Sequence, residues 1–507
     1  MNNEGIPNIG NNQILNVDYS KVLSLNIIGK PYITVSSKGI TNGLSTIPND
    51  GADFGPDTSL GATNPNQIGG STLTQTSGIQ EAVNYIIANG GGKLYVKKGH
   101  YVMGSGATFS KVGNICYDGT NTADFYALFN LNSTNVTGIY IEGETMAIPS
   151  TGGNTTTIPF LWGGVTIDMS NVTLPSTSNI YVVFGAQNTN GQVTNPVTTR
   201  GITVMAPTPM NFGHTIISSS SSCTVEYCAL IPLPGEQNFF SGIASTNPLN
   251  IGFHISGQDG NMAWANMLYV QQAYTSYILT SHATAGTIGV QSCIRGLIPN
   301  GGYTLTILHY DVQGTTYPIY LNANGTGGYT TLIVDWQEED YSAVSNVNTA
   351  FKTIYDVYCE YNGSPSQALE VHVINAVLNR NNASNDVNPK VSGGLFIKFD
   401  NLQFIGQNTL PATLSVNPPV SGTVYQNTNP YDIEIDLPAY ATTSGTAGYV
   451  TLAKGPTSTP TSIGNQFVNG ATSSTSAEII KLEVPAGWYY SFTASGVTLG
   501  TSTVFAK

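Results

Sequence analysis

The chain has 507 residues, a mass of 53.5 kDa and a formal net charge of −13, and only 9% of its residues are charged. Nucleic acids and anionic lipids are bound through clusters of Lys and Arg, which this sequence lacks, so we expect neither as a partner. The 40% of hydrophobic residues supply a large core and exclude a disordered protein. No apolar run approaches the roughly 20 residues of a membrane span, so we expect no membrane insertion.

Residues 1–49 are polar apart from two apolar runs, at residues 22–28 and 32–35. This segment is either an initial pair of strands or an attachment to another protein, and both interpretations stay open. The first residues, MNNEGIPNIGNN, show no basic leader followed by an apolar stretch. We therefore expect either a trimmed leader or a protein that leaves its cell assembled into a particle.

A short amphipathic helix is predicted at residues 79–89. Apolar residues recur there at the spacing of one helix face: Ile79, Ala82, Val83, Ile86 and Ile87. We expect Ser77 to cap the first turn, with Gln80 as the returning half of a capping box. Gly90 opens a glycine run that ends the helix.

The residues after this helix predict two short strands, because apolar and polar residues alternate on both sides of Gly99 in GGGKLYVKKGHYVM. The succession of GAD, DT, IQEAVN and GGGKLYV resembles the start of the pectin-lyase-like right-handed parallel β-helix family. That family holds polysaccharide lyases, glycoside hydrolases and viral tailspikes, and its helix covers the open end of the first coil. The chain departs from the family pattern by a polar insert at residues 59–75 and by Lys97 and Lys98 where proline is common.

Short apolar runs recur from residue 101 to about residue 406, with turns between them and no long helical pattern. Strands repeated at about 20 to 35 residues per turn fit stacked coils. This periodicity alone also fits a series of β-sandwiches, and the family resemblance decides for the solenoid. We therefore predict an all-β chain in which residues 50–407 form a right-handed parallel β-helix with an N-terminal capping helix.

A different pattern begins near residue 408. Three prolines, Pro411, Pro418 and Pro419, indicate a linker or an edge crossing. After them, residues 431–437 alternate cleanly between apolar and polar, and four further strand-like runs follow up to residue 506. Residues 420–507 are therefore predicted to form a small antiparallel β-sandwich, which is similar to the small β modules that end viral fibre proteins.

The densest acidic stretch is DWQEEDY at residues 335–341, which we expect in a surface loop after a strand. A glycan site needs an aromatic face and, for cleavage, two carboxyl groups. Trp336, Glu338 and Glu339 are accordingly the candidate carbohydrate-binding residues, and Glu338, Glu339 and Asp340 the candidate catalytic acids. In a glycan site, Trp336 is partly exposed and shares one concave surface with two of the acids. The competing interpretation is a solvated acidic turn with Trp336 packed beneath it.

The catalytic motifs of the polygalacturonases and pectate lyases are absent, and Asp168 is interpreted as a turn cap. Several histidines lie within apolar strands, in FHI, LHY and VHV, and are predicted to be core or stacking residues. No metal-ligand or cofactor-binding spacing occurs, so we expect neither a metal nor a cofactor. The five cysteines are scattered; most are expected as small buried residues, and a disulfide between Cys223 and Cys228 is the alternative.

These patterns predict a fibre or spike protein on the surface of a virion, outside the cell, that binds a host cell-surface glycan or receptor. We expect other virion proteins to bind its N-terminal segment. The resemblance implies a homotrimer, since fibre β-helices usually associate in threes, and a chain with so few charges must hide surface or stay soluble through neutral polar groups. A polysaccharide lyase or glycoside hydrolase on the same scaffold is the first alternative, so whether the chain is an enzyme is left open. A purely structural surface or filament protein is the second.

Overall fold

The structure is a computed structural model. It describes residues 31–40, 50–133, 136–145, 164–187, 196–207, 212–220, 222–233, 245–257, 263–280, 283–300, 304–321, 329–339, 353, 356–359, 369–379, 395–405, 414–416, 419–427, 432–470, 477–485 and 487–506.

Most strands lie in two long sheets whose members alternate along the chain. The larger sheet runs in the order β1 (Tyr32–Val35), β2 (Gly92–Val96), β6 (Ile139–Gly143), β9 (Val197–Arg200), β12 (Cys223–Pro232), β14 (Ala263–Gln271), β16 (Ala283–Gln291), β18 (Thr304–Gln313), β20 (Tyr329–Glu339), β22 (Leu369–Asn379) and β23 (Leu395–Ile405). Three strands branch from it: β3 (Gly99–Val102), β7 (Val165–Asp168) and β10 (Ile202–Ala206). The strands of this sheet pair in parallel, as β12 does with β9, β10 and β14.

The second sheet runs in the order β21 (Val357–Cys359), β19 (Tyr317–Leu321), β17 (Arg295–Asn300), β15 (Thr275–Thr280), β13 (Ile251–Gly257), β11 (Gly213–Ser220), β8 (Ile180–Gln187), β5 (Thr122–Asn130) and β4 (Ser110–Cys116). Its strands also pair in parallel, except for the antiparallel hairpin β4–β5.

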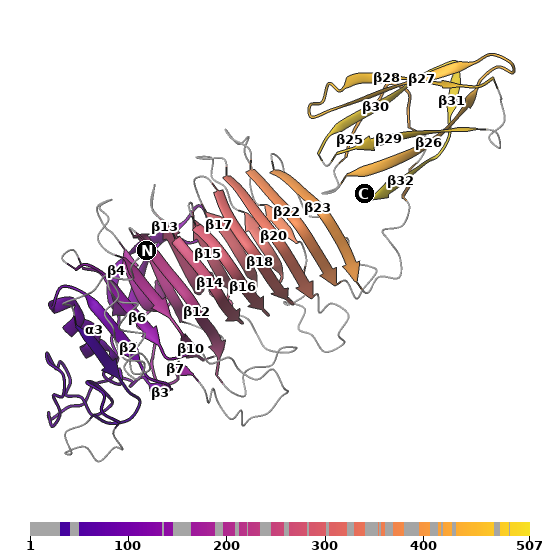
Figure 1. The fold of residues 1–507 in the computed structure, drawn as a ribbon. Coiled ribbons are helices and arrows are strands. Elements are labelled where there is room, and N and C mark those ends of the chain that lie inside the picture. The colour runs from indigo at the N-terminus through magenta and orange to yellow at the C-terminus, as the bar shows by residue number, and fades with distance from the viewer. Residues whose placement is uncertain are drawn as a thin grey trace, which may run out of the picture.

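A chain that alternates between two parallel sheets winds as a solenoid, and its coils follow one another along the long axis in Figure 1. Ala263 lies beside Ala283, and Thr284 lies beside Thr306, so one coil takes about 20 residues in this region. The predicted parallel β-helix is confirmed.

The interior is filled by apolar side chains, with one aromatic ring per coil over five strands. Ring centroids are 5.3 Å apart for Phe129 and Phe184, 5.7 Å for Phe184 and His214, 4.8 Å for His214 and Phe253, and 5.7 Å for Phe253 and Tyr277. These distances are close to the ~4.8 Å between neighbouring strands, so the rings form a continuous column.

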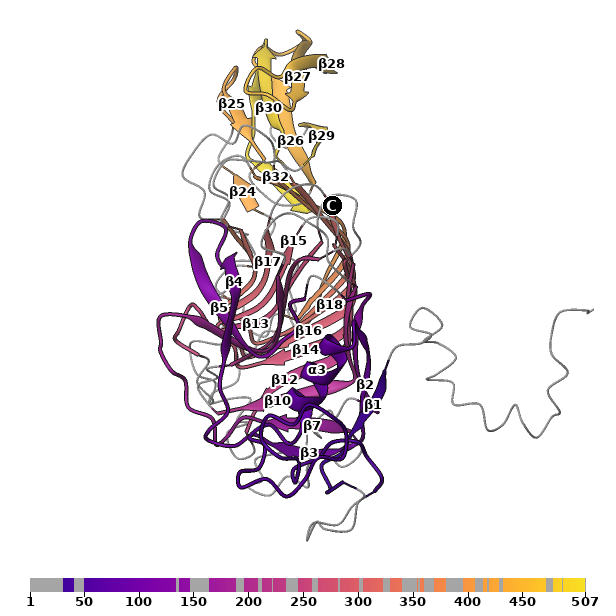
Figure 2. The same cartoon turned by 90° about the vertical axis from the view of Figure 1, so that its left-hand side faces the viewer.

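Helix α3 (Ile79–Ala88) buries its apolar face against the first coils, as predicted, and in Figure 2 it lies over the end of the stack. Its C-terminus is closed by the glycine run, since Gly90 and Gly91 donate their N–H groups to the carbonyls of Ile87 and Ile86, each at 3.0 Å. The helix thus covers core residues that the first coil leaves open.

The prediction that Ser77 caps this helix is wrong. Gly78, in the left-handed conformation (φ 84°), occupies the N-cap, and the hydroxyl of Ser77 donates to the carbonyl of Val102 at 3.0 Å. The N–H of Gln80 donates instead to the hydroxyl of Thr76 at 3.2 Å. Buried Glu81 accepts the hydroxyl of Thr74 at 2.7 Å, so a threonine turn organises the first turn of the helix.

The solenoid begins before residue 50, the predicted boundary. Strand β1 pairs in parallel with β2, and Val35 also bridges to Phe54. Residues 32–35 are therefore part of the first coil, whereas the apolar run at residues 22–28 lies outside the described residues. Among the described residues, no helix has the length and apolar character of a membrane span.

Two antiparallel sheets form the C-terminal unit. One contains β24 (Leu414–Val416), β32 (Ser502–Ala506), β26 (Ile433–Ala441), β29 (Glu478–Val484) and β31 (Val497–Leu499); the other contains β25 (Val424–Gln426), β30 (Tyr489–Ser495), β27 (Gly448–Gly455) and β28 (Thr461–Val468). Their inner faces share one core, which confirms the predicted β-sandwich. The proline-rich stretch supplies the edge strand β24, and Leu402 of β23 packs against the cores of both units.

Candidate functional site

The predicted acidic loop is a strand. β20 continues to Glu339 and pairs with β18 on one side and β22 on the other. Trp336 is therefore 0% exposed, with its ring centroid 5.8 Å from that of Tyr310 and 6.1 Å from that of Phe399. The partly exposed Trp336 that a glycan site in this stretch requires is therefore not found. The ring is packed inward, as the competing interpretation expects, although in a strand and not beneath a turn.

Glu338 and Glu339 do not meet on one surface. Alternation along the strand places Glu338 inside with Trp336, where its Oε1 accepts the hydroxyl of Thr353 at 3.0 Å. Glu339, the next residue, belongs to the opposite face and is half-buried, and Asp340 lies outside the described residues. The concave surface predicted for Trp336 and two of Glu338, Glu339 and Asp340 is not formed with Glu338 and Glu339, because consecutive side chains of one strand point to opposite faces.

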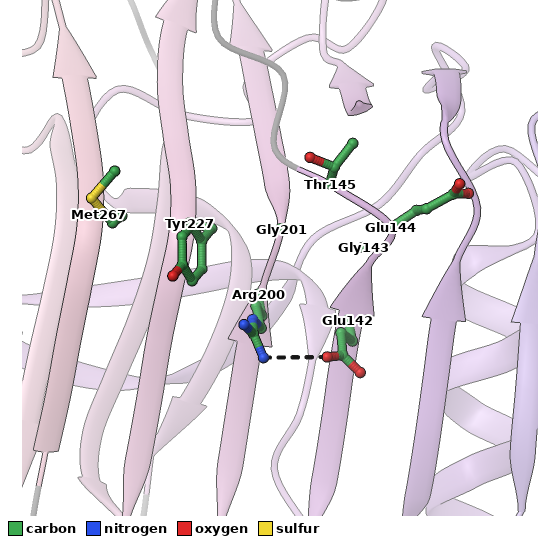
Figure 3. Close-up of a pocket in the computed structure, with 8 residues that line it drawn as sticks. All are labelled: Glu142, Gly143, Glu144, Thr145, Arg200, Gly201, Tyr227 and Met267. Carbon is green, nitrogen blue, oxygen red and sulfur yellow. Dashed lines mark ion pairs between the residues drawn. The ribbon is translucent and has the colours of Figure 1, made fainter. Parts of the chain in front are cut away.

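A different site lies on the outer face of the larger sheet, where β6, β9, β12 and β14 pass a corner of the coil (Figure 3). It is an open groove of about 470 Å³. Its lining consists of Glu142, Gly143, Glu144, Thr145, Arg200, Gly201, Tyr227 and Met267.

Backbone geometry turns two large side chains toward this groove. Gly201, Tyr227 and Met267 occupy equivalent positions on successive strands, since Arg200 pairs with Glu226, which in turn pairs with Asn266. All three have positive φ, at 70°, 52° and 51°. This conformation suits glycine but costs roughly 1–2 kcal/mol at other residues. Tyr227 and Met267 nevertheless adopt it and stand 37% and 39% exposed.

Charged side chains run across the strands beside these residues. Glu142 Oε2 forms an ion pair with Lys93, and its Oε1 lies 3.6 Å from Arg200 Nη1. Arg200 Nε lies 3.6 Å from Glu226 Oε2, and Glu226 Oε1 accepts the indole N–H of Trp264 at 2.6 Å. Each carboxylate thus uses its two oxygens for two different donors.

The arrangement suits recognition of a sugar. The guanidinium carbon of Arg200 lies 5.1 Å from the ring centroid of Tyr227, so the ring is braced by a cation while part of it stays accessible. Aromatic and thioether surfaces contact the apolar faces of sugars, and the surrounding carboxylate and guanidinium groups bond hydroxyls. In Figure 3 the side chains of Tyr227 and Arg200 lie close together between Glu142 and Met267.

Sequence reasoning missed these residues, although a signal exists. In IYIEG, TTRG and TVEY, a charged residue directly precedes the corner residue Gly143, Gly201 or Tyr227. The three strands that carry these sequences are neighbours in the sheet, so their charged residues lie in one row across it. The signal becomes visible only once the strand register is known.

The histidine prediction is correct for some residues and wrong for others. His214 and His254 are buried, and burial lowers the pKa of each to about 4. His309 and His372, in LHY and VHV, are instead outward and paired with Asp335 and Asp400, with N–O distances of 2.7 Å. The aspartates on the neighbouring strands hold these imidazoles on the polar face.

Asp168 caps a turn, as predicted, by accepting the N–H of Ser170 at 2.8 Å, and it also pairs with His100. Cys223 and Cys228 are free, which excludes the alternative of a disulfide between them. Burial raises the pKa of both thiols to about 12, so they are inert packing residues. In the part of the chain that the structure describes, no group of three His, Cys, Asp or Glu side chains is placed to hold a metal ion.

The fold and the groove together define a parallel β-helix protein with an N-terminal capping helix, a C-terminal β-sandwich and an open polar and aromatic groove on one sheet. No protein-family model and no curated protein matches the sequence.

Solved structures similar to this chain include three phage tailspikes. One is the tailspike of the E. coli bacteriophage HK620, a mutant in complex with a hexasaccharide: 13% identity, 96% of this chain and 93% of that chain covered, TM-score 0.32. The enzymatically active domain of tailspike protein 4 of bacteriophage CBA120 is 12% identical over 98% of this chain and 80% of its own, with a TM-score of 0.21. That of tailspike protein 2 of the same phage is 12% identical over 87% and 75%, with a TM-score of 0.23.

Proposed function

We propose that the chain is a fibre or spike protein on a virion surface that binds a host cell-surface glycan in the groove at Tyr227. The observation that carries this proposal is the pair of large residues, Tyr227 and Met267, held outward at positive φ. Strained backbone of this kind is retained where the surrounding structure enforces it, and it concentrates at binding and catalytic sites. A host receptor protein is the other ligand class compatible with an exposed aromatic groove.

The occupied carboxylates favour binding over cleavage. Hydrolysis of a glycosidic bond needs one carboxyl group to donate a proton and another to attack or to activate water. The oxygens of Glu142 and Glu226 already hold Lys93, Arg200 and Trp264. Incubation with host-envelope polysaccharide followed by analysis of products separates the alternatives, since a lyase or hydrolase releases oligosaccharides and a binding protein does not.

Replacing Tyr227 by Gly is expected to abolish most glycan binding while leaving the fold at least as stable as in the wild type. Gly accepts φ 52° without cost, so its backbone gains up to about 1 kcal/mol over that of Tyr, whereas the ring that contacts the sugar is lost. Adsorption to host cells and the denaturation midpoint are the two measurements.

The matched control is Tyr227→Ala, which also loses the ring but keeps a side chain in the unfavourable conformation. It should lose binding equally and be less stable than Tyr227→Gly. Undiminished adsorption by both variants would remove the groove from the proposed function and would mean that the chain binds host cells through another surface.

Attachment to other virion proteins is proposed for the N-terminal segment. Residues 1–30 lie outside the described residues, so this part rests on their polar sequence alone. Deleting them should leave isolated protein able to bind host cells but unable to join the particle, measured by its copy number in purified virions.

We also expect a homotrimer. Edge strand β28 carries no charged residue, and it exposes 51% of Ile463 and 74% of Phe467. Exposed edges without charges or proline invite pairing with another chain, which supports association. Light scattering at micromolar concentration should give three times the chain mass, and Phe467→Lys should lower it; a monodisperse wild-type monomer would contradict the prediction.

A further inference from the structure

The cations of the groove are already neutralised by its own carboxylates. Arg200 has Glu142 on one side and Glu226 on the other, and Lys93 is paired with Glu142. Glu144, the third acid, accepts the backbone N–H of Lys98 at 3.0 Å. Glu142 and Glu226 therefore pair with both cationic side chains, and Glu144 adds a third negative charge to the lining, within a chain whose net charge is −13.

We infer that the groove selects glycan segments without acidic groups, that is, neutral sugars recognised through their hydroxyls. This inference rests on the proposed glycan-binding function and names the class of ligand. A hydroxyl donates to a carboxylate oxygen, which accepts more than one hydrogen bond, so a neutral sugar adds to the existing network without breaking an ion pair.

An acidic sugar is instead repelled by the carboxylates of the groove. A uronate, sulfate or phosphate group held by Arg200 would lie at short range from the charges of Glu142 and Glu226, which already pair with that guanidinium. The ion pairs lie at a partly exposed surface, where the repulsion is screened only beyond about 8–10 Å at physiological salt. The negative net charge of the chain adds a repulsive long-range field for polyanions.

The test uses an array of purified bacterial surface oligosaccharides of three kinds: neutral repeats, uronate-containing repeats, and the same uronate repeats after chemical reduction of their carboxyl groups. The full-length protein is applied with Tyr227→Ala as the groove control. The wild-type protein should bind neutral or carboxyl-reduced repeats, and Tyr227→Ala should lose this binding. Each uronate-containing repeat should bind at least about tenfold more weakly than its carboxyl-reduced form.

A second variant checks the electrostatic cause. Glu144→Gln removes one negative charge and keeps an oxygen that accepts the N–H of Lys98, so it should narrow the difference between a uronate repeat and its reduced form by severalfold, and more at low salt than at high salt.

The possible outcomes separate the two proposals. A uronate repeat that binds as well as or better than its reduced form, with a signal that Tyr227→Ala abolishes, overturns the inference of neutral specificity and leaves the glycan-binding function standing. If no array signal depends on Tyr227, the proposed function itself is overturned, and the inference with it.

Discussion

Replacing Trp336 by Ala is expected to lower the free energy of unfolding of the β-helix by about 3–5 kcal/mol. The ring is fully buried between Tyr310 and Phe399, and truncation leaves a cavity that close-packed neighbouring coils cannot collapse to fill. Denaturant unfolding followed by fluorescence or circular dichroism measures the loss. Glycan binding should fall only in proportion to the unfolded fraction, because the ring does not reach the surface.

Two variants on the same strand make this test specific. Gln337→Ala removes the exposed neighbour of Trp336 and should change stability by no more than about 0.5 kcal/mol. Trp336→Phe should cost less than Trp336→Ala, since it keeps most of the ring and removes a buried Nε1–H that has no acceptor among the described residues. A stable Trp336→Ala protein with weakened glycan binding would show that the ring is at the surface and that the strand assignment is wrong.

Acidification from pH 7 to pH 4 is expected to destabilise the β-helix through two buried imidazoles. Burial lowers the pKa of His214 and of His254 from 6.5 to about 4 in the folded state. Below pH 6.5 the unfolded chain therefore binds protons that the folded chain does not, and the free energy of unfolding falls until about pH 4. By linkage each histidine contributes up to roughly 3 kcal/mol to this loss.

Substitution of His254 measures its own contribution to the loss of stability at low pH. In the register of the second sheet, His254 lies between Ile216 and Ile278, so His254→Leu places an apolar side chain in an apolar row. Denaturation midpoints are measured at several pH values between 7 and 4. The stability of the variant relative to the wild type should increase as the pH falls. An unchanged difference across that interval would mean that His254 is not buried as a neutral group.

The sequence predicts the scaffold better than the site, for a physical reason. The capping helix is specified by a local pattern, since the apolar stripe of residues 79–87 and the glycines after it determine where the helix packs and where it ends. The C-terminal strands are likewise visible as alternating residues, as in β26. Both signals depend on residues a few positions apart.

The groove depends on residues that are far apart in sequence. Glu142, Arg200 and Glu226 become neighbours only through the parallel register of β6, β9 and β12, which the intervening coil lengths determine. The stretch DWQEED is also misinterpreted because its strand neighbours are distant in sequence. Its acidity suggests solvent, but β18 and β22 flank it, so its alternate side chains are forced into the core.

The coil that joins β14 to β16 shows how the molecule can change in length. Ala283 and Gln291 lie beside Ala263 and Gln271, each 20 residues further along the chain. A deletion or duplication of one such unit preserves the inward and outward alternation of every remaining rung and alters the axial length by about 4.8 Å. A change by one residue within a strand would instead exchange its buried and exposed faces. The length of the β-helix can therefore change by whole coils.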